Sequence, residues 1–219
     1  MHPEAVQRRL EPELLDSLPP DHPDAIRSRR DLRIVNRVMG NVRWFESVIP
    51  ALTRPGERVI ELGAGTGELC RTLHSRHVAA DGLDRVPAPA GWSAPARWHQ
   101  ADIQTFTGWS DYPVVIGNLI LHHFDDAGLR ALGDAIRPHA RVLVFSEPTR
   151  RRRCQWLWAV AAPLGGANHV TRHDGRVSIA AGFYGDELPR ALGLDPALWH
   201  WKITTTWVGA YRLVAERRT

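Results

Sequence analysis

The spacing of apolar and polar residues predicts a chain in which strands and helices alternate. Short apolar runs, which are typical of strands buried on both faces, occupy 58–62, 78–84, 96–102, 113–118 and 140–145. Apolar residues at steps of three and four predict intervening helices, the clearest over 68–76, 125–137, 154–162 and 184–192. Two further strands are predicted over 198–203 and 208–215. This order indicates an α/β protein built on a doubly wound, mostly parallel sheet.

The first 54 residues have a helical pattern of their own. A short helix is predicted over 3–10, followed by a turn at Pro19. A longer amphipathic helix is predicted over 25–52, broken near Gly40. Its arginine-rich face is either a solvated surface or a cap that offers Arg33 or Asn36 to a ligand. We therefore expect a helical cap over 1–54 and a main domain over 55–219.

The strongest chemical signal is the run VIELGAGTG at 59–67. An apolar strand ends near the acid Glu61, and three glycines follow at alternate positions, where they let a ligand lie against the backbone. Strand, glycine loop and helix form the first unit of an open nucleotide-binding sheet. The dinucleotide fingerprint G-x-G-x-x-G would need a glycine at position 68, where the chain has Glu68.

The pattern E-x-G-x-G-x-G resembles the first motif of the class I S-adenosylmethionine (SAM)-dependent methyltransferases of the small-molecule type. Asp84 and Asp102 end the next two predicted strands, as acids do in that family. The resemblance implies a seven-stranded, Rossmann-like sheet in which the seventh strand is antiparallel. It also implies that SAM is the cofactor and that the residues holding it are Glu61, Gly63, Ala64, Gly65, Gly67, Asp84, Arg85, Asp102, Ile103, Asn118 and Leu119, with Arg33 added from the cap.

The segment after the fourth strand carries the candidate catalytic groups. Asn118 is followed by Leu119 and Ile120, which disfavours the adenine-methylating enzymes, and no cysteine nucleophile for cytosine methylation is present. His122 or His123 could take a proton from an acceptor, and Glu147 at the end of the fifth strand could orient or deprotonate it. Transfer by proximity alone is the alternative.

The segment 149–182 is longer than a plain connection, so it predicts an inserted lid that chooses the substrate. We expect residues 163–182 to form a loop and Trp156, His169 and Arg176 to contact the substrate. The His169-x-x-x-His173 spacing suits a helix, but Gly175 argues against one. No metal site is expected.

Composition narrows the setting. The chain has 219 residues, a net charge of +4 and two widely separated cysteines, Cys70 and Cys154. No signal peptide and no membrane span are recognisable, so a cytoplasmic location is expected. Four consecutive arginines at 150–153 are a weak nucleic-acid signal, and a nucleic-acid partner is not expected. A monomer or homodimer that binds a small-molecule acceptor is expected.

These observations predict a methyltransferase that modifies an oxygen, or a nitrogen, of a small metabolite. Nine tryptophans favour an aromatic or quinol-like acceptor. Three alternatives stay open at this point: an NAD(P)-dependent oxidoreductase on the same sheet, an inactive methyltransferase-fold partner subunit, and an RNA methyltransferase.

Overall fold

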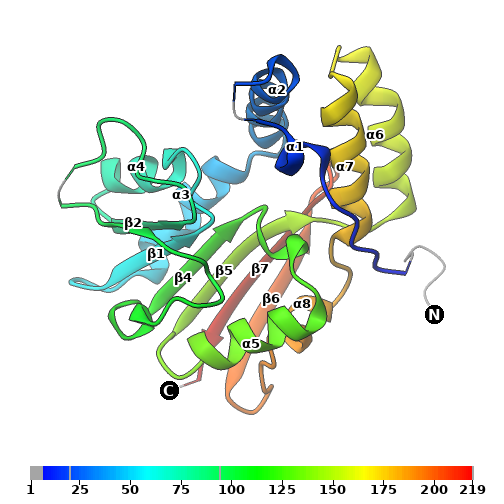
Figure 1. Cartoon of the computed structure of the whole chain (residues 1–219). Helices are drawn as coiled ribbons and strands as arrows, with labels where there is room; N and C mark the ends of the chain where they lie inside the picture. The colour runs from blue at the N-terminus through cyan, green and yellow to red at the C-terminus, as the bar shows by residue number, and fades with distance from the viewer. Residues whose placement is uncertain (1–6, 20, 94, 219) are drawn as a thin grey trace.

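A seven-stranded sheet forms the centre of the computed structural model, which describes residues 7–19, 21–93 and 95–218 (Figure 1). The strand order is β3-β2-β1-β4-β5-β7-β6. Strands β1 to β5 pair in parallel, and β7 is antiparallel to both β5 and β6. The predicted fold is confirmed. The strands are β1 (Arg58–Leu62), β2 (Ala79–Asp84), β3 (Trp98–Gln100), β4 (Val114–Asn118), β5 (Val142–Pro148), β6 (Trp199–Thr205) and β7 (Ala210–Arg217).

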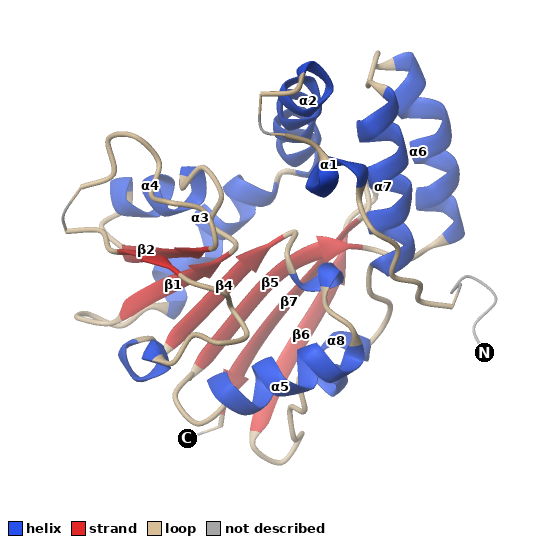
Figure 2. Cartoon of the chain, viewed as in Figure 1, coloured by secondary structure: helices blue, strands red, loops and turns tan. Residues whose placement is uncertain are grey.

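Helices cover both faces of the sheet (Figure 2). Helices α3 (Asn41–Leu52) and α4 (Glu68–Ser75) pack on one face, and α5 (Asp126–Ile136) and α8 (Glu187–Ala191) pack on the other. Because side chains alternate along a strand, Val59 points to the first core and Ile60 to the second. This two-sided burial explains the continuous apolar runs of the central strands.

An acid inside β2 is accommodated by donors from three residues. Asp81 is fully buried, and its carboxylate accepts hydrogen bonds from Arg58 Nε at 2.7 Å, from the Tyr112 hydroxyl at 2.9 Å and from the backbone N–H of Arg97 at 2.7 Å. The next residue, Gly82, leaves room for the ring of Trp98. Asp81 and Gly82 both weakened the strand pattern in the sequence. In the fold, Asp81 is hydrogen-bonded by residues distant in the chain, and Gly82 makes room for a distant tryptophan.

The N-terminal part differs from its prediction in one element. Helix α2 (Pro23–Met39) and α3 are separated at Gly40, whose φ of 65° confirms the predicted break. The helix predicted over 3–10 is wrong where the structure describes it, because residues 7–10 are not helical, while residues 3–6 lie outside the described part. The first helix is α1 (Leu14–Ser17). The proposed domain boundary at residue 54 stays a prediction. Helix α3, which precedes that boundary, packs directly on the sheet.

The loop predicted over 163–182 is also wrong. Residues His169–Ala181 form α7, which packs against α6 (Arg152–Leu164). Gly175 lies inside α7 because a side chain there would collide with the ring of Trp158 from α6. Helices α1, α2, α6 and α7 gather beyond the carboxyl ends of β4 and β5 (Figure 1).

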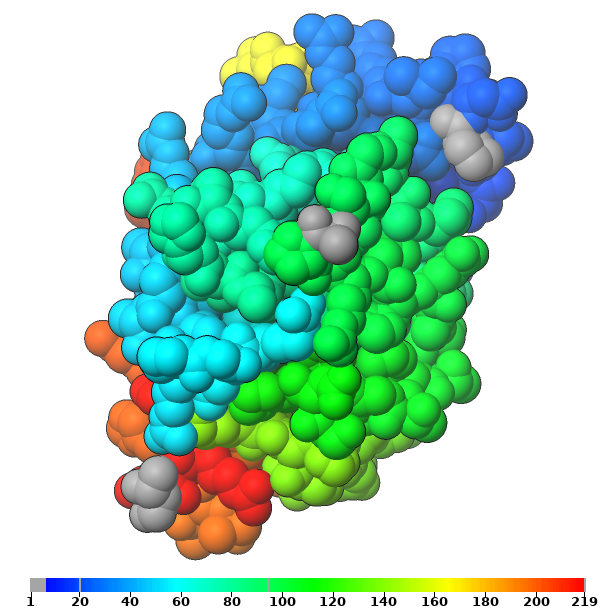
Figure 3. Space-filling view, turned by 90° about the vertical axis from the view of Figure 1, so that its left-hand side faces the viewer, coloured from blue at the N-terminus to red at the C-terminus, as the bar shows by residue number. Residues whose placement is uncertain are grey.

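The tip that joins α6 to α7 lies beside α2. Arg27 Nη2 donates to the carbonyl of Gly166 at 2.8 Å, and Figure 3 shows this yellow tip next to the blue helix. Two short 3₁₀ helices complete the described elements, η1 (Gly108–Asp111) and η2 (Leu121–His123). None of the described helices has the length and apolar character that crossing a bilayer requires.

Candidate active site

A cleft of about 630 Å³ lies at the carboxyl ends of the central strands. This is where open α/β sheets bind their ligands. One side is formed by Gly63, Asp84, Arg85, Asp102 and Ile103. The opposite side is formed by Glu13, Ile120, His122, His123 and Phe124, with Val177 and Ala181 of α7 behind them. The cleft therefore joins the glycine loop to the histidine segment.

The glycine loop borders this cleft, and its first glycine, Gly63, lines it. Gly63, Gly65 and Gly67 all have positive φ angles, of 63°, 53° and 66°, which suit glycine. A side chain at Gly63 would collide with Ile120, and one at Gly67 would collide with Trp92. At Gly65 the nearest atom would lie 3.9 Å away, so this position is open. Its N–H donates to Asp84 Oδ2 at 2.7 Å, which ties the loop to the end of β2.

Glu61 lies beneath the loop and is almost fully buried. Its carboxyl accepts a hydrogen bond from the thiol of Cys70 at 3.0 Å, and Cys70 is its one hydrogen-bond partner among the described residues. Burial raises the pKa of Glu61 to about 8; the Cys70 contact lowers it, and the nearby charge of Asp84 raises it further. Burial also raises the pKa of the Cys70 thiol well above its usual value. A cation bound next to Glu61 would therefore stabilise the ionised form of its carboxyl.

The chain turns sharply after β4. Asn118 accepts from Asn41 Nδ2 at 2.9 Å and donates to Asn36 Oδ1 at 3.2 Å, so α2 and α3 are fastened to the strand end. Leu119 has a φ of 58°, a conformation that is rare for a branched side chain and often marks a functional site. Its N–H donates to the carbonyl of Ser146 at 2.8 Å. The turn directs the following residues into the cleft.

Glu147 holds that turn in place. It is fully buried, and Oε1 accepts from the backbone N–H groups of Ile120 at 3.1 Å and Leu121 at 2.8 Å. Oε2 lies 2.7 Å from His122 Nδ1. The carboxylate thus contacts the histidine segment instead of the cleft. Its geometry makes Glu147 a positioning residue, which corrects its expected contact with an acceptor.

His122 lies between two carboxylates. Its Nε2 is 3.7 Å from Glu13 Oε1, and its Nδ1 contacts Glu147. Burial lowers the pKa of His122, but the nearby carboxylates of Glu13 and Glu147 outweigh that effect and raise the pKa to about 9. The His123 ring lies 4.2 Å from the His122 ring. Desolvation lowers the pKa of His123, and the charge of His122 lowers it further. At neutral pH, His123 is the histidine able to accept a proton.

Residues 7–18, here called the N-terminal strap, carry Glu13 into the cleft. Arg8 donates to the carbonyls of Phe124 at 2.7 Å and Ala181 at 2.8 Å. Asp174 of α7 accepts from the N–H groups of Leu14 at 2.8 Å and Leu15 at 3.0 Å. The strap therefore joins η2 to α7 and closes one side of the cleft.

The predicted site residues fall into three groups. Seven line the cleft: Gly63, Asp84, Arg85, Asp102, Ile103, His122 and His123. Seven support it from beneath or beside: Glu61, Ala64, Gly65, Gly67, Asn118, Leu119 and Glu147. Four are exposed and do not line it: Arg33, Trp156, His169 and Arg176.

The sequence interpretation missed the contribution of the strap. Glu13, Phe124 and Gln104 line the cleft but were not among the expected residues. Glu13 occurs in a segment rich in proline and acids, without periodicity or a motif. Only the fold of α7, which binds the strap, brings this carboxylate to the histidines. Phe124 follows the two histidines directly, so its position offered a signal.

The sheet order and the antiparallel β7 define the class I methyltransferase fold, as the motifs predicted. No family model matches the chain, and no curated protein matches its sequence. Solved structures do resemble it. The plantazolicin methyltransferase BpumL, in complex with a triazolic desmethyl analogue and S-adenosylhomocysteine (SAH), has a TM-score of 0.71 at 9% identity, over 94% of this chain and 93% of that chain.

Two other solved structures have a similar fold and a higher sequence identity to this chain. The pyocyanin biosynthetic protein PhzM has a TM-score of 0.60 at 19% identity, over 90% of this chain and 60% of that chain. Magnesium protoporphyrin IX methyltransferase from Synechocystis PCC 6803, with bound SAH, has a TM-score of 0.57 at 18% identity, over 87% and 86%. At these identities the likeness establishes the shared fold.

Proposed function

We propose that this protein is a SAM-dependent methyltransferase acting on an oxygen, or a nitrogen, of a small aromatic or quinol-like metabolite. One observation carries the proposal: a single cleft has the glycine loop and two strand-end acids on one side and His123 on the other. A cofactor on the first side would place its reactive end toward the second. Two structural neighbours contain SAH, which supports the choice of cofactor.

The residues around the loop fit this cofactor. The open backbone at Gly65 admits a close ligand, and Asp84 retains acceptor capacity for ribose hydroxyls beside its bonds to Gly65 and Val86. Asp102 and Ile103 line the cleft where an adenine would be held. Glu61 would neutralise the ammonium group. When bound, the cofactor supplies an electrophilic methyl group.

The acceptor would lie between this methyl group and η2. His123 would accept the hydroxyl proton as the acceptor oxygen gains the methyl group, because its lowered pKa keeps the imidazole neutral. The contact between His122 of η2 and the buried Glu147 beneath it fixes the position of the neighbouring His123. Alignment of the reacting atoms and exclusion of water would supply most of the acceleration.

Cofactor titration separates the methyltransferase from an oxidoreductase. Glu68, an acid in the first turn of α4, disfavours a pyrophosphate at that helix end. We expect calorimetry to detect binding of SAM and SAH and no binding of NAD or NADP. The reverse result would reject the proposal.

Turnover separates the enzyme from an inactive partner subunit. The purified protein, supplied with isotopically labelled SAM and a small-molecule extract of the host, should label a metabolite detectable by mass spectrometry. His123→Ala should bind SAM normally but transfer the label more slowly by about a hundredfold. An unchanged rate constant would reject the base role. Binding without any labelled product would favour the inactive subunit, and labelled RNA would favour the RNA enzyme.

The two cysteines bear on the cellular location of the protein. Cys70 and Cys154 are both free and buried, which supports the expected cytoplasmic location. We expect a monomer or a homodimer, and sedimentation analysis distinguishes the two.

A further inference from the structure

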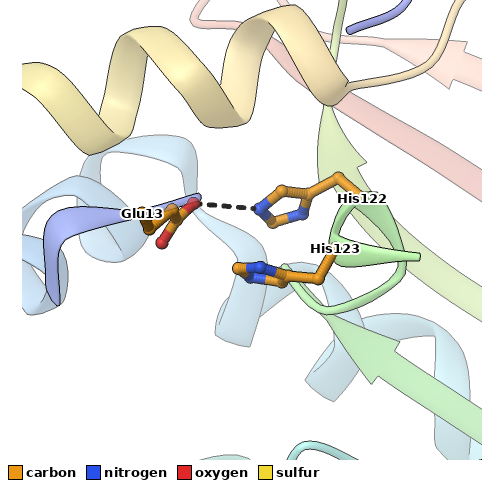
Figure 4. Close-up of side chains that lie close together, drawn as sticks. All are labelled: Glu13, His122 and His123. Carbon is orange, nitrogen blue, oxygen red and sulfur yellow. Dashed lines mark ion pairs between the residues drawn. The ribbon is translucent and has the colours of Figure 1, made fainter. Parts of the chain in front are cut away.

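Three side chains of metal-binding type meet at one point of the cleft. Glu13 comes from the strap, and His122 and His123 come from η2 (Figure 4). One ligand atom from each lies within 4.8 Å of the others. This group differs from the His169-x-x-x-His173 spacing that the sequence offered. From this geometry we propose that Glu13, His122 and His123 bind a first-row divalent transition-metal ion.

The orientation of His122 supports this assignment. Its Nδ1 lies 2.7 Å from the buried Glu147 carboxylate, which leaves Nε2 directed toward Glu13. A carboxylate that holds the far nitrogen of an imidazole is the usual outer partner of a metal-bound histidine. Here that partner is fixed in turn by the backbone of Ile120 and Leu121. The histidine is therefore oriented before any ion arrives.

The distances suit an ion better than a direct hydrogen bond. Glu13 Oε1 lies 3.7 Å from His122 Nε2, longer than the roughly 2.7–3.2 Å of a hydrogen bond. Ligands about 2.1 Å from a metal lie about 3 Å apart. Glu13 and His122 would need to close by less than about 1 Å, and the widest pair of the three ligand atoms, at most 4.8 Å apart, by up to about 2 Å. The hydroxyl of Ser178 in α7 donates to Glu13 Oε1 at 2.5 Å and holds this carboxylate beside the two histidines.

Charge and ligand type identify the ion. Glu13 and Glu147 together place two negative charges beside two imidazoles, which a divalent cation would balance. Two nitrogens and one oxygen favour iron, cobalt, nickel, copper or zinc over magnesium and calcium, which prefer oxygen ligands throughout. Two imidazoles and one carboxylate leave coordination positions free. Here those positions face the cleft that all three residues line.

The free positions suggest which acceptors would be selected. This part of the inference rests on the proposed methyl transfer. An acceptor with two adjacent oxygens, such as a catechol, could bind the ion through both. The ion would then stabilise the ionised oxygen, and His123 would serve as a ligand in place of a free base. The acceptor proton would pass to solvent as the oxygen–methyl bond forms and the sulfur–methyl bond breaks.

Metal titration tests the site without reference to turnover. The full-length protein, stripped with a chelator, is titrated with Co²⁺ and followed by visible absorption, and with Zn²⁺ by calorimetry. We expect one equivalent to bind, and Glu13→Gln and His123→Ala each to weaken binding at least tenfold. Circular dichroism confirms that each variant is folded.

Matched controls exclude binding elsewhere on the surface. Glu11→Gln changes a carboxylate on the same strap outside the cluster, and His169→Ala changes an exposed histidine of α7. Both should bind the ion as the unmodified protein does. No binding at 1 mM metal, or equal affinity in Glu13→Gln and His123→Ala, would overturn the proposal.

A parallel titration with SAM keeps the two proposals distinguishable. If SAM binds and the metal does not, the metal site is wrong and the methyltransferase proposal stands. If the metal binds at the three residues and SAM does not, the site stands and the methyltransferase proposal falls.

Discussion

At the scale of single residues, buried acids mark the places where the chain departs from simple core packing. Asp81 accepts hydrogen bonds from three residues and stabilises the sheet. Glu147 is satisfied by backbone N–H groups and His122 and serves the turn after β4. Glu61 has only Cys70 as its hydrogen-bond partner among the described residues, through the thiol and the backbone N–H. A buried carboxyl with so little compensation is a candidate for binding a cation.

The pKa of Glu61 leads to a prediction on cofactor affinity. Without ligand the pKa is about 8, so near neutral pH the carboxyl is mostly protonated. A cationic cofactor needs the ionised form, so its affinity should rise by about tenfold between pH 6.5 and pH 8.5. Calorimetry over this range measures the effect. In Glu61→Gln only the titration of the cofactor remains, so a rise of the same size there would contradict the prediction.

The raised pKa of Glu61 also determines whether this group makes the free energy of unfolding rise or fall with pH. Because folding raises the pKa of Glu61, the ligand-free protein binds more protons at this group than the unfolded chain does. Its contribution is fully present below the unfolded value of 4.5 and is lost as pH rises through about 8. The Glu61→Gln variant should lack this loss in thermal unfolding.

At the scale of elements, close helix contacts depend on glycines that a periodicity pattern cannot interpret. Gly175 broke the helical pattern of 169–181 in the sequence, yet it lets the ring of Trp158 pack against α7. Trp158 Nε1 also donates to the carbonyl of Arg172 at 3.1 Å. The low helix propensity of glycine is thus offset by a contact with another helix. This is why the loop predicted over 163–182 is wrong and residues 169–181 form a helix.

Gly133 provides a test of the same effect on the other face of the sheet. A side chain there would collide with the backbone carbonyl of Leu192, just after α8. Gly133→Ala gains about 1 kcal/mol of helix propensity but loses up to about 3 kcal/mol through overpacking. We expect a net destabilisation of about 1–2 kcal/mol, measured as a fall in melting temperature of about 3 °C.

Gly128→Ala is the matched control in the same helix. A side chain at Gly128 would meet chiefly the flexible end of Gln104. Its melting temperature should change little or rise slightly. If the two variants melted at the same temperature, the contact between α5 and the residues after α8 would not limit packing.

At the scale of the whole molecule, the N-terminal strap links parts of the chain that the sheet alone leaves apart. It contacts η2 through Arg8 and Glu13, and α7 through Asp174 and Ser178. The guanidinium of Arg8 also lies 4.8 Å from the centre of the Phe183 ring. The strap is therefore fixed at few points along one wall of the cleft.

Loosening one of these points should expose the strap. In Arg8→Gln, the bonds to the carbonyls of Phe124 and Ala181 are lost. We expect a glutamate-specific protease to cleave at Glu11 and Glu13 several times faster, since cleavage follows local opening. The side chain of Arg9 is exposed, so Arg9→Gln is the control and should be cleaved at the original rate. Equal rates in the two variants would show that Arg8 does not anchor the strap.

The sequence by itself determined the sheet, its order of elements and the glycine loop, because each is written in neighbouring residues. Apolar runs identify buried strands, and Gly63, Gly65 and Gly67 identify a backbone held with positive φ. The tertiary structure alone decided where Glu13 lies, that residues 169–181 are helical, and that Trp156, His169 and Arg176 do not line the cleft. Those outcomes depend on contacts between segments that are distant in the sequence, and such contacts cannot be predicted from local periodicity.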